Sequence, residues 1–446
     1  MHVQIVQPYL CYNNQYIQTL KCDNEGIISE YAFSGCTNLT SVICNNNGEI
    51  GLNAFNGCKN LTSAVCNNDG NISSNAFSGC KNLTSAVCNN DGNIGSNAFS
   101  GCENLTSVVC NNSGEIGNNA FSGCVKINSL TLGEKVSSIG DYSFQGCPSL
   151  PSVSIPNSVS SIGKYAFSGC SSLANVTIGN NVKTLESYVF QDCSFPSITI
   201  PASVNSIQDY VFTGCENLKD VIIANRDNEL SLGSNGRSPL FSDCPIDSVY
   251  IGGNISYNTA SSKGYSPFYR HTSLRTVVIA DKETEVSPNE FFGCTNLQNV
   301  AIGDGVTSFG DWAFSGCTSL KRLSFGSQLT SIGKEAFSDC SSVTQIVSKA
   351  VTPPSCGTQA LDDINKWECT LTVPERSLAS YQQADQWKEF FFIEGRNFDD
   401  GIGNVKSEFS QEEDYYDLQG RKIAEPQKGI NIIRYSDGST RKVMVK

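Results

Sequence analysis

The stretch Ala32-Phe33-Ser34-Gly35-Cys36-Thr37-Asn38-Leu39-Thr40-Ser41-Val42-Ile43-Cys44 decides the fold, because the chain repeats it. The chain contains fourteen copies of the segment Phe33-Ser34-Gly35-Cys36, and one of them, Phe268-Tyr269-Arg270-His271, has His271 in the position of the cysteine. A period of about 20 to 29 residues that contains a Leu-x-x-Val-x-Ile strand predicts a solenoid, in which each unit covers the apolar face of its neighbour. The Phe-x-Gly/Asp-Cys segment returns, mostly every 22 or 23 residues, at Cys58, Cys80, Cys102, Cys124, Cys147, Cys170, Cys193, Cys215, Cys244, Cys294, Cys317 and Cys340.

Each unit contains the pattern of a short strand followed by a turn. Leu39, Val42 and Cys44 are expected to point inward, and Ile43 to point outward, because side chains alternate along a strand. The turn Asn45 to Gly48, and in later units the pair Ser161-Ile162, predict a reversal and a second brief strand. The Ala-Phe-Ser-Gly-Cys piece predicts one helical turn that ends at glycine. Fifteen strands, with Ile17 to Cys22 as the first, would make a rod roughly 70 Å long.

The unit from Leu150 to Leu173 reads Leu-x-x-Val-x-Ile-Pro-x-Ser-Val-x-Ser-Ile-Gly-x-x-Ala-Phe-x-Gly-Cys-x-x-Leu and resembles the BspA-like class of bacterial leucine-rich repeats. The resemblance extends over roughly residues 17 to 395. It implies a β-rich α/β fold, a right-handed solenoid of about 14 to 15 parallel rungs with short helical turns. It also implies a cell-surface or secreted binding protein, often an adhesin, without catalytic residues.

The chain is expected to form one long domain with smaller terminal parts, since a repeat array needs a single continuous core. Pro353-Pro354 ends the regular units, and a strand with a following helix is predicted from Leu371 to Tyr381. Trp367, Trp387 and 390–392 are expected to seal the last rung. The predicted parts are an N-terminal cap (1–20), the solenoid (21–348), a degenerate last repeat with a C-terminal cap (349–396), a linker (397–413) and a small β module (414–446).

The tail differs from the rest in charge and pattern. Residues 414–446 hold seven Lys or Arg against four Asp or Glu and contain three strand-like pieces, 416–423, 428–433 and 442–446. This tail resembles the C-terminal sorting module of secreted Bacteroidetes proteins that type IX secretion systems recognise. The resemblance implies location outside the cell or on the outer-membrane surface of a Bacteroidetes-type bacterium.

Composition excludes several classes of partner. A formal charge of -13 and a pI near 4.7 disfavour nucleic acid and anionic membranes. No apolar run approaches the roughly 18 residues of a membrane-spanning helix. Met1 to Leu20 shows no basic segment followed by a long apolar run, so an exported form would have lost its leader.

The 21 cysteines follow the repeat. Thirteen occupy the position of Cys36, and five occupy the position of Cys44. Equivalent side chains on successive rungs run parallel and rarely satisfy the torsion of a disulfide. Most are therefore expected to be buried thiols that act as small hydrophobes.

The sequence contains few residues that could form a catalytic site. His2 and His271 are the only histidines, and no nucleophile with a base at suitable spacing can be assembled. His271 is expected to have a structural role.

Two turns contain side-chain oxygens that could bind calcium: Asn67 to Asn71, with Asp69, and the equivalent turn with Asp91. We interpret them as tight turns. No metal ligand or cofactor is predicted.

Two candidate interaction surfaces follow from the sequence. One is an exposed strand stripe of branched apolar residues, Ile43, Val65, Val87 and Val109, which strand propensity alone could also explain. The other lies where the period breaks, between Cys215 and Cys294, with extra residues at 225–238 and 252–267 that are expected to loop off the rod. Its candidate ligand-binding residues are Arg226, Arg237, Tyr250, Tyr257, Tyr265, Tyr269 and Arg270, types enriched at interface hot spots.

The leading hypothesis is a non-catalytic recognition or adhesion protein that presents a solenoid face and irregular loops to an extracellular or host protein. The alternative is a carbohydrate-binding protein that assists glycan degradation, suggested by the Tyr-rich loops. A hydrolase that uses carboxylates of the irregular loops is the third hypothesis. The ligand and the oligomeric state stay open.

Overall fold

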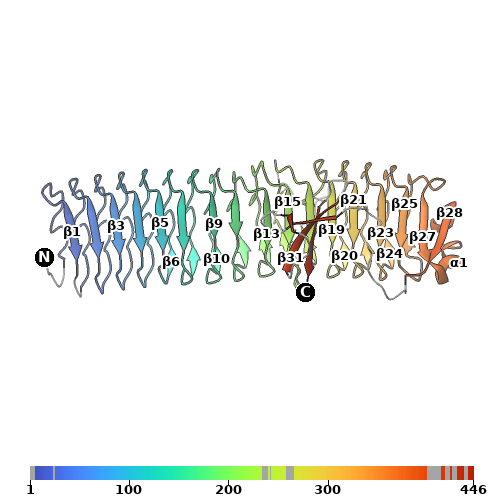
Figure 1. Cartoon of the computed structure of the whole chain (residues 1–446), viewed down its shortest axis with the longest axis horizontal. Coiled ribbons are helices and arrows are strands. Elements are labelled where there is room, and N and C mark those ends of the chain that lie inside the picture. The colour runs from blue at the N-terminus through green and yellow to red at the C-terminus, as the bar shows by residue number, and fades with distance from the viewer. Residues whose placement is uncertain are drawn as a thin grey trace. The chain divides into compact units, whose positions relative to one another are not determined.

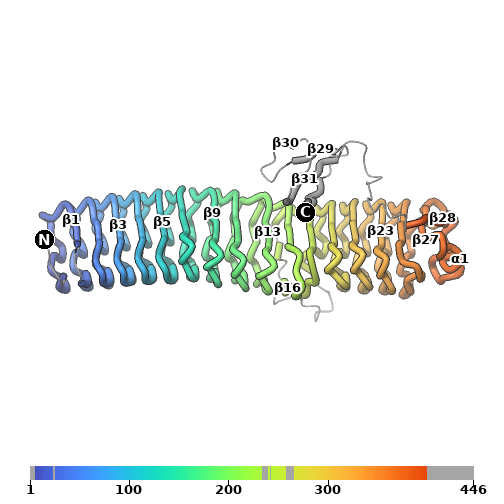
Figure 2. Tube along the Cα trace, turned by 60° about the horizontal axis from the view of Figure 1, so that its bottom comes forward, coloured from blue at the N-terminus to red at the C-terminus, as the bar shows by residue number. Residues whose placement is uncertain are grey.

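The computed structural model describes residues 6–23, 26–233, 240–241, 243–257 and 266–398, and the backbone of four strands between 413 and 445. The chain divides into two compact units, Met1–Arg396 and Asn397–Lys446. The first unit is a stack of parallel β rungs that begins with β1 (Thr19–Cys22) and ends with β28 (Phe392–Arg396) (Figure 1 and Figure 2). The predicted β-rich solenoid of many parallel rungs is confirmed.

Each rung carries one main strand, and fifteen of these lie in the described repeats, as the period predicts. The main strands are β1, β2 (Ser41–Cys44), β3 (Ser63–Cys66), β4 (Ser85–Cys88), β5 (Ser107–Cys110), β7 (Ser129–Leu132), β9 (Ser152–Ser154), β11 (Asn175–Thr177), β13 (Ser197–Ile200), β15 (Asp220–Ile223), β17 (Ser248–Ile251), β19 (Thr276–Ile279), β21 (Asn299–Ile302), β23 (Arg322–Phe325) and β25 (Gln345–Ser348).

A second short strand on the other side of the rung forms its own parallel ladder. In the N-terminal rungs this ladder is reduced to single bridges that link Ile28, Ile50, Ile72 and Ile94. Farther along it consists of β6 (Glu115–Ile116), β8 (Ser138–Ile139), β10 (Ser161–Ile162), β12 (Thr184–Leu185), β14 (Ser206–Ile207), β16 (Leu230–Leu232), β18 (Ile255–Ser256), β20 (Glu285–Val286), β22 (Ser308–Phe309), β24 (Ser331–Ile332) and β26 (Ser355–Cys356).

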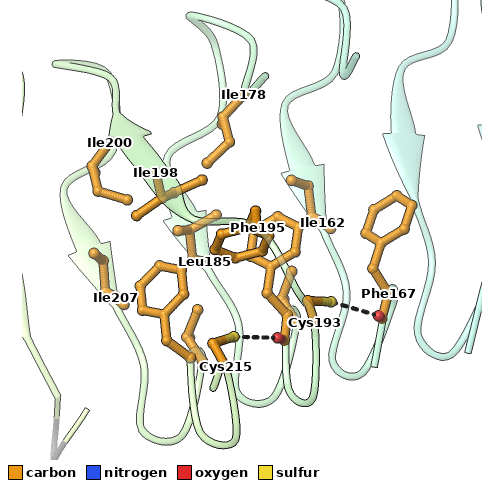
Figure 3. Packing of buried hydrophobic residues seen from close by; sticks show 14 of the residues in the cluster. Ile162, Phe167, Ile178, Leu185, Cys193, Phe195, Ile198, Ile200, Ile207 and Cys215 are labelled. Carbon is orange, nitrogen blue, oxygen red and sulfur yellow. Dashed lines mark hydrogen bonds between the residues drawn. The ribbon is translucent and has the colours of Figure 1, made fainter. Parts of the chain in front are cut away.

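The core lies between the two ladders and consists of columns of equivalent side chains. Leu39, Val42 and Cys44 are completely buried, so their predicted inward orientation is confirmed. Phe167 stacks against the equivalent Phe190 with ring centroids 5.9 Å apart. Figure 3 shows this packing from close by. A single rung cannot bury its own apolar faces. The hydrophobic effect therefore stabilises the array through contacts between adjacent rungs.

The Ala-Phe-Ser-Gly-Cys piece forms consecutive tight turns and not a helix. Gly101 has a φ of 70°, in the left-handed region where glycine is not strained. Asn97, directly before this piece, has a φ of 56°, a conformation that asparagine tolerates better than most residues. Left-handed residues therefore stand at both ends of the turn from Asn97 to Gly101, and the chain reverses within these five positions.

Parts of the two predicted insertions belong to the rungs, while 234–238 and 258–265 lie outside the described residues. Strand β16 lies inside 225–238 and pairs with β14, and β18 lies inside 252–267 and pairs with β16. The expectation that both segments loop off the rod is therefore wrong for these residues. The turns before the strands differ in length, and the second ladder is continuous from β6 to β18 and starts again at β20.

At the N-terminal end, residues 6–14 form half a rung. Val6 bridges to Ile28, and Cys11 occupies the place of Phe33, since its N–H donates to the carbonyl of Ala32 as the N–H of Phe33 donates to the carbonyl of Ala54. Region 1–20, predicted as a cap, thus contains a shortened copy of the repeat. Leu10 in this half-rung is 48% exposed.

The C-terminal end is closed by β27 (Thr370–Pro374), η1 (Glu375–Ser377), α1 (Leu378–Tyr381), η2 (Trp387–Glu389) and β28. Trp387 is fully buried, and its Nε1–H donates to the carbonyl of Pro354 at 2.8 Å. Trp367 is 72% exposed and Phe391 63% exposed. The expectation that these two also seal the last rung is wrong.

The second unit contains a four-stranded antiparallel sheet in the order β30-β29-β31-β32. Its strands are β29 (Glu413–Tyr416), β30 (Lys422–Ile423), β31 (Gly429–Tyr435) and β32 (Thr440–Val445). The first of the three predicted pieces thus contains parts of two strands. In the part of the chain that the structure describes, no helix is long and apolar enough to cross a bilayer.

All 21 cysteines are free thiols, and nineteen are buried. The column of Cys36 has a role that the sequence does not show: the thiol of Cys193 donates to the carbonyl of Phe167, and that of Cys215 to the carbonyl of Phe190 (Figure 3). Burial raises the pKa of the Cys170 thiol to about 12. These groups therefore remain protonated donors that tie each rung to the one before it.

Candidate interaction surface

Strands β2 to β5 expose one in-register column of branched apolar side chains. Ile43 pairs with Val65, Val65 with Val87, and Val87 with Val109. All four side chains are half-buried, while the residues directly before and after each of them in its strand are buried. The sequence-predicted stripe is therefore a continuous ridge on the outer side of the strands. We call the outward side of β2 to β5 the N-terminal strand face.

Hydrogen-bonded ladders border this ridge on both sides. Asn67 donates from Nδ2 to Oδ1 of Asn45 at 2.8 Å, and Asn89 donates in the same way to Asn67. On the other border, Thr84 Oγ1 donates to the carbonyl of Thr62 at 2.9 Å. Side chains held in this way lose little conformational freedom when another molecule covers them. The face is thus ordered before any partner arrives.

The N-terminal strand face carries no charge, because the four strands contain only Ser, Ala, Val, Ile and Cys. The face of the later strands differs. There Asp247 and Arg275 form an exposed ion pair at 3.3 Å, and Arg322 continues the column of Asp220. Interface centres are depleted in charged residues and can bury apolar area. The N-terminal strand face therefore suits association better than the remaining strand face.

Arg226 lies in the segment that connects β15 to β16, and its side chain is directed into the rung. It is 2% exposed, and its guanidinium donates to the carbonyls of Val204 at 2.6 Å and Pro201 at 3.1 Å. Burial lowers the pKa of this guanidinium. Gly253 of the next rung makes room for it, since a Cβ on Gly253 would stand 2.7 Å from Cγ of Arg226. A side chain used in this way is not available to a ligand.

Two of the candidate tyrosines are engaged within the array. Tyr250 continues the outward column between Ile222 and Val278, and its hydroxyl donates to Oδ1 of Asn225 at 2.6 Å. Tyr257 is half-buried and donates to the carbonyl of Pro288 at 2.9 Å. Burial, with the Glu290 carboxyl nearby, raises the pKa of Tyr257. Only Tyr250 of this pair lies on the strand face.

Tyr269 and Arg270 form a small surface cluster with a residue that sequence reasoning missed. The ring of Tyr269 stacks on that of Phe292 at 5.1 Å, and the guanidinium carbon of Arg270 lies 5.3 Å and 5.7 Å from the two ring centroids. Phe292 fills a position that holds a serine in most units, which is the signal that could have revealed it. Arg237 and Tyr265 lie outside the described residues.

A column of stacked tyrosines was also missed. Tyr142, Tyr165, Tyr188 and Tyr210 are partly exposed and stack with centroids 4.5 to 4.9 Å apart. Each has a positive φ, at the position where the earlier units have asparagine. Their spacing of 22 or 23 residues is visible in the sequence. Stacking covers the ring faces, so the column exposes mainly ring edges and hydroxyls.

The described residues offer little for catalysis or metal binding. They contain no group of three or more His, Cys, Asp or Glu side chains that could hold a metal ion. His271 is half-buried, hydrogen-bonds Ser273 at 3.1 Å, and has its pKa lowered by burial. Asn68, in the turn considered for calcium, donates to the carbonyl of Gly70 at 2.7 Å and thereby closes the turn.

A stack of parallel rungs with leucine, phenylalanine and cysteine columns defines a leucine-rich-repeat protein. The family described as "BspA type Leucine rich repeat region (6 copies)" matches residues 4–128, 92–219, 137–262 and 262–353. These matches together span 4–353, which is more than half of the 446 residues. The chain therefore belongs to the BspA-type leucine-rich-repeat family.

Solved structures of similar fold come from several bacteria. A leucine-rich repeat protein from Bacteroides ovatus ATCC 8483 is 21% identical, with 89% of this chain and 88% of that chain covered and a TM-score of 0.43. A leucine rich cell surface protein from Faecalibacterium prausnitzii A2-165 is 20% identical, with 76% and 79% covered and a TM-score of 0.30. An internalin from Listeria monocytogenes is 14% identical, with 76% and 82% covered and a TM-score of 0.28. Among curated proteins, none matches this chain.

Proposed function

We propose that this chain is a non-catalytic recognition protein, secreted or held at the bacterial surface, that binds an extracellular protein through the N-terminal strand face. The observation that carries the proposal is the uncharged, in-register ridge of Ile43, Val65, Val87 and Val109 on a chain whose formal charge is -13. A neutral ridge between ordered polar ladders permits close approach where most of an acidic surface would repel an acidic partner.

The cluster of Tyr269, Arg270 and Phe292 is the second proposed contact. It presents an exposed guanidinium over two stacked rings, a combination enriched at interface hot spots. The cluster belongs to the turn side of its rung, whereas the ridge belongs to the strand side. A partner that needs both would have to reach around the array.

The test is binding of the purified chain to a panel of immobilised extracellular matrix proteins and to a glycan array. In the variant Val65→Glu/Val87→Glu, two carboxylates on the ridge should reduce protein binding at least tenfold. The matched control Thr177→Glu/Thr199→Glu places the same charges in the same outward column of later rungs and should leave binding unchanged. Equal loss in both variants, or no loss in the first, would refute the ridge as the binding surface.

The carbohydrate alternative is decided by the same panel. Glycan binding that is lost in Tyr269→Ala and retained in Val65→Glu/Val87→Glu would replace the protein-recognition proposal. Residues 414–446 are proposed, from their resemblance alone, to be a sorting module. Fusing residues 397–446 to a reporter in a bacterium with type IX secretion tests this, because export of the reporter is expected.

A further inference from the structure

Two glutamates fill core positions in one rung of the array. The N–H of Glu283 donates to the carbonyl of Ala280, as the N–H of Val159 donates to that of Pro156. The N–H of Glu290 donates to the carbonyl of Ser287, as the N–H of Ala166 donates to that of Gly163. These shared backbone contacts show that Glu283 stands in a valine position and Glu290 in an alanine position.

Both acids are as buried as the apolar residues they replace. Glu283 is 2% exposed and Glu290 is 1% exposed. The carboxylate of Glu283 accepts the N–H of Ile255 from the preceding rung, and its Oε2 has no hydrogen-bond partner among the described residues. Glu290 accepts the N–H of Ser287 at 2.8 Å through Oε2.

Among the residues that the structure describes, which do not include Lys263, the charged groups around the pair do not offset its negative charge. The negative charges of Glu285 and Glu229 repel that of Glu283 and raise its pKa. Those of Glu283 and Glu285 do the same to Glu290. Two described cations of these rungs, Lys282 and Arg226, are engaged elsewhere. Lys282 pairs with Asp227, and the guanidinium of Arg226 faces backbone carbonyls.

The other described neighbours of the pair are neutral. Tyr257 of the preceding rung directs its hydroxyl to the carbonyl of Pro288, and Ser266 directs its hydroxyl to the carbonyl of Glu290. The equivalent positions of the following rung hold Val306 and Ala313. A buried carboxyl group without a counter-charge avoids the cost of desolvation by keeping its proton.

We propose that Glu283 and Glu290 form a buried proton-binding site, which loosens the central rungs when the two carboxyl groups lose their protons. Burial raises the pKa of Glu283 from an ordinary value of 4.5 to about 8, and that of Glu290 in the same direction. Local stability is therefore fully present below about pH 4.5 and decreases as the pH rises to 8, because the opened rung releases protons that the closed rung holds.

Hydrogen exchange on the full chain tests this proposal. Protection factors, which are corrected for the intrinsic exchange rate at each pH, should fall between pH 5 and 8 in residues 276–297, by about tenfold per pH unit from Glu283 alone and more steeply where Glu290 also loses its proton. Amides of 41–110 in the same molecules are the internal control and should vary far less. Equal pH dependence in the two regions would overturn the proposal.

Two variants separate the proton site from other causes. Glu283→Gln/Glu290→Gln keeps the shape of the side chains, and Glu283→Val/Glu290→Ala restores the residues of the neighbouring rungs. Both should remove the excess pH dependence of 276–297, and its persistence in both would overturn the proposal. Restoration of protection at pH 8 by calcium chloride in the wild-type chain would also overturn it, since the pair would then be a cation site.

Discussion

The thiol of Cys193 donates a hydrogen bond of 3.3 Å to the carbonyl oxygen of Phe167, which lies 26 residues earlier in the chain. The same bond recurs with Cys58, Cys80, Cys102 and Cys124 and the phenylalanine of the preceding rung. Cysteine thus satisfies a buried carbonyl while filling the space of a small apolar residue. This dual use explains why the position holds cysteine and not alanine.

Thiol chemistry follows from this arrangement. In the native chain, an aromatic disulfide reagent at pH 8 should modify at most Cys11 and Cys356, because the other nineteen thiols are buried. Even Cys356 should react slowly, since burial raises its pKa to about 12 and little thiolate is present. Absorbance of the released thiolate should report all 21 groups after unfolding in guanidinium. Rapid reaction of many thiols before unfolding would contradict the buried columns.

Removal of one ring from the phenylalanine column should be costly. Phe167 is fully buried between Phe144, at 5.3 Å, and Phe190, at 5.9 Å. Phe167→Ala is expected to destabilise the array by about 3 to 5 kcal/mol, measured by urea unfolding. Tyr16→Ala, at a side chain that is 91% exposed, is the control and should change stability by less than about 0.5 kcal/mol. Equal stability of the two variants would mean that the column is not the core.

The left-handed glycines make a conformational prediction. A Cβ on Gly101 would meet nothing within 4 Å, so only its φ of 70° opposes a side chain. Gly101→Ala should therefore destabilise by about 1 kcal/mol, and Gly101→Asn by less, because asparagine tolerates this region. Thermal unfolding of both variants gives the comparison. Equal losses would point to a steric cause.

Arg226 was predicted to bind a ligand, but its side chain is buried and should stabilise the array. Arg226→Ala should destabilise the array by about 2 to 4 kcal/mol, because buried carbonyls of Val204 and Pro201 lose their donor and the stem leaves a cavity. Arg275→Ala is the matched control. It breaks an ion pair whose arginine side chain is 64% exposed, and exposed pairs contribute less than about 1 kcal/mol. Denaturant titration distinguishes the two outcomes.

The repeat pattern was enough to predict the rungs, the inward set of Leu39, Val42 and Cys44, and the outward ridge that begins at Ile43. A strict period transmits the geometry of one unit to all others, so one correct interpretation holds for every copy. Fifteen main strands in the described repeats follow from it.

The irregular rungs could not be predicted in this way. Residue type suggested exposure for Arg226, but the space beside Gly253 and the carbonyls of an earlier rung determine its burial. Glu283 stands eight residues before Phe291, as Val159 stands eight residues before Phe167, so the spacing gives its core position, but its residue type suggested exposure. Where spacing changes, the sequence no longer states which residues meet across rungs, and the environment of each side chain depends on contacts between distant positions.

The near-identity of the rungs between Cys36 and Cys124 has an evolutionary consequence. If one 22-residue unit were excised, Asn89 would meet Asn45 in place of Asn67, Val87 would meet Ile43, and Phe99 would meet Phe55. Every new neighbour has the same chemistry as the old one. Unequal recombination can therefore shorten or lengthen this segment while preserving its internal bonds, so the reach of the rod is a trait that selection can adjust without redesigning its interior.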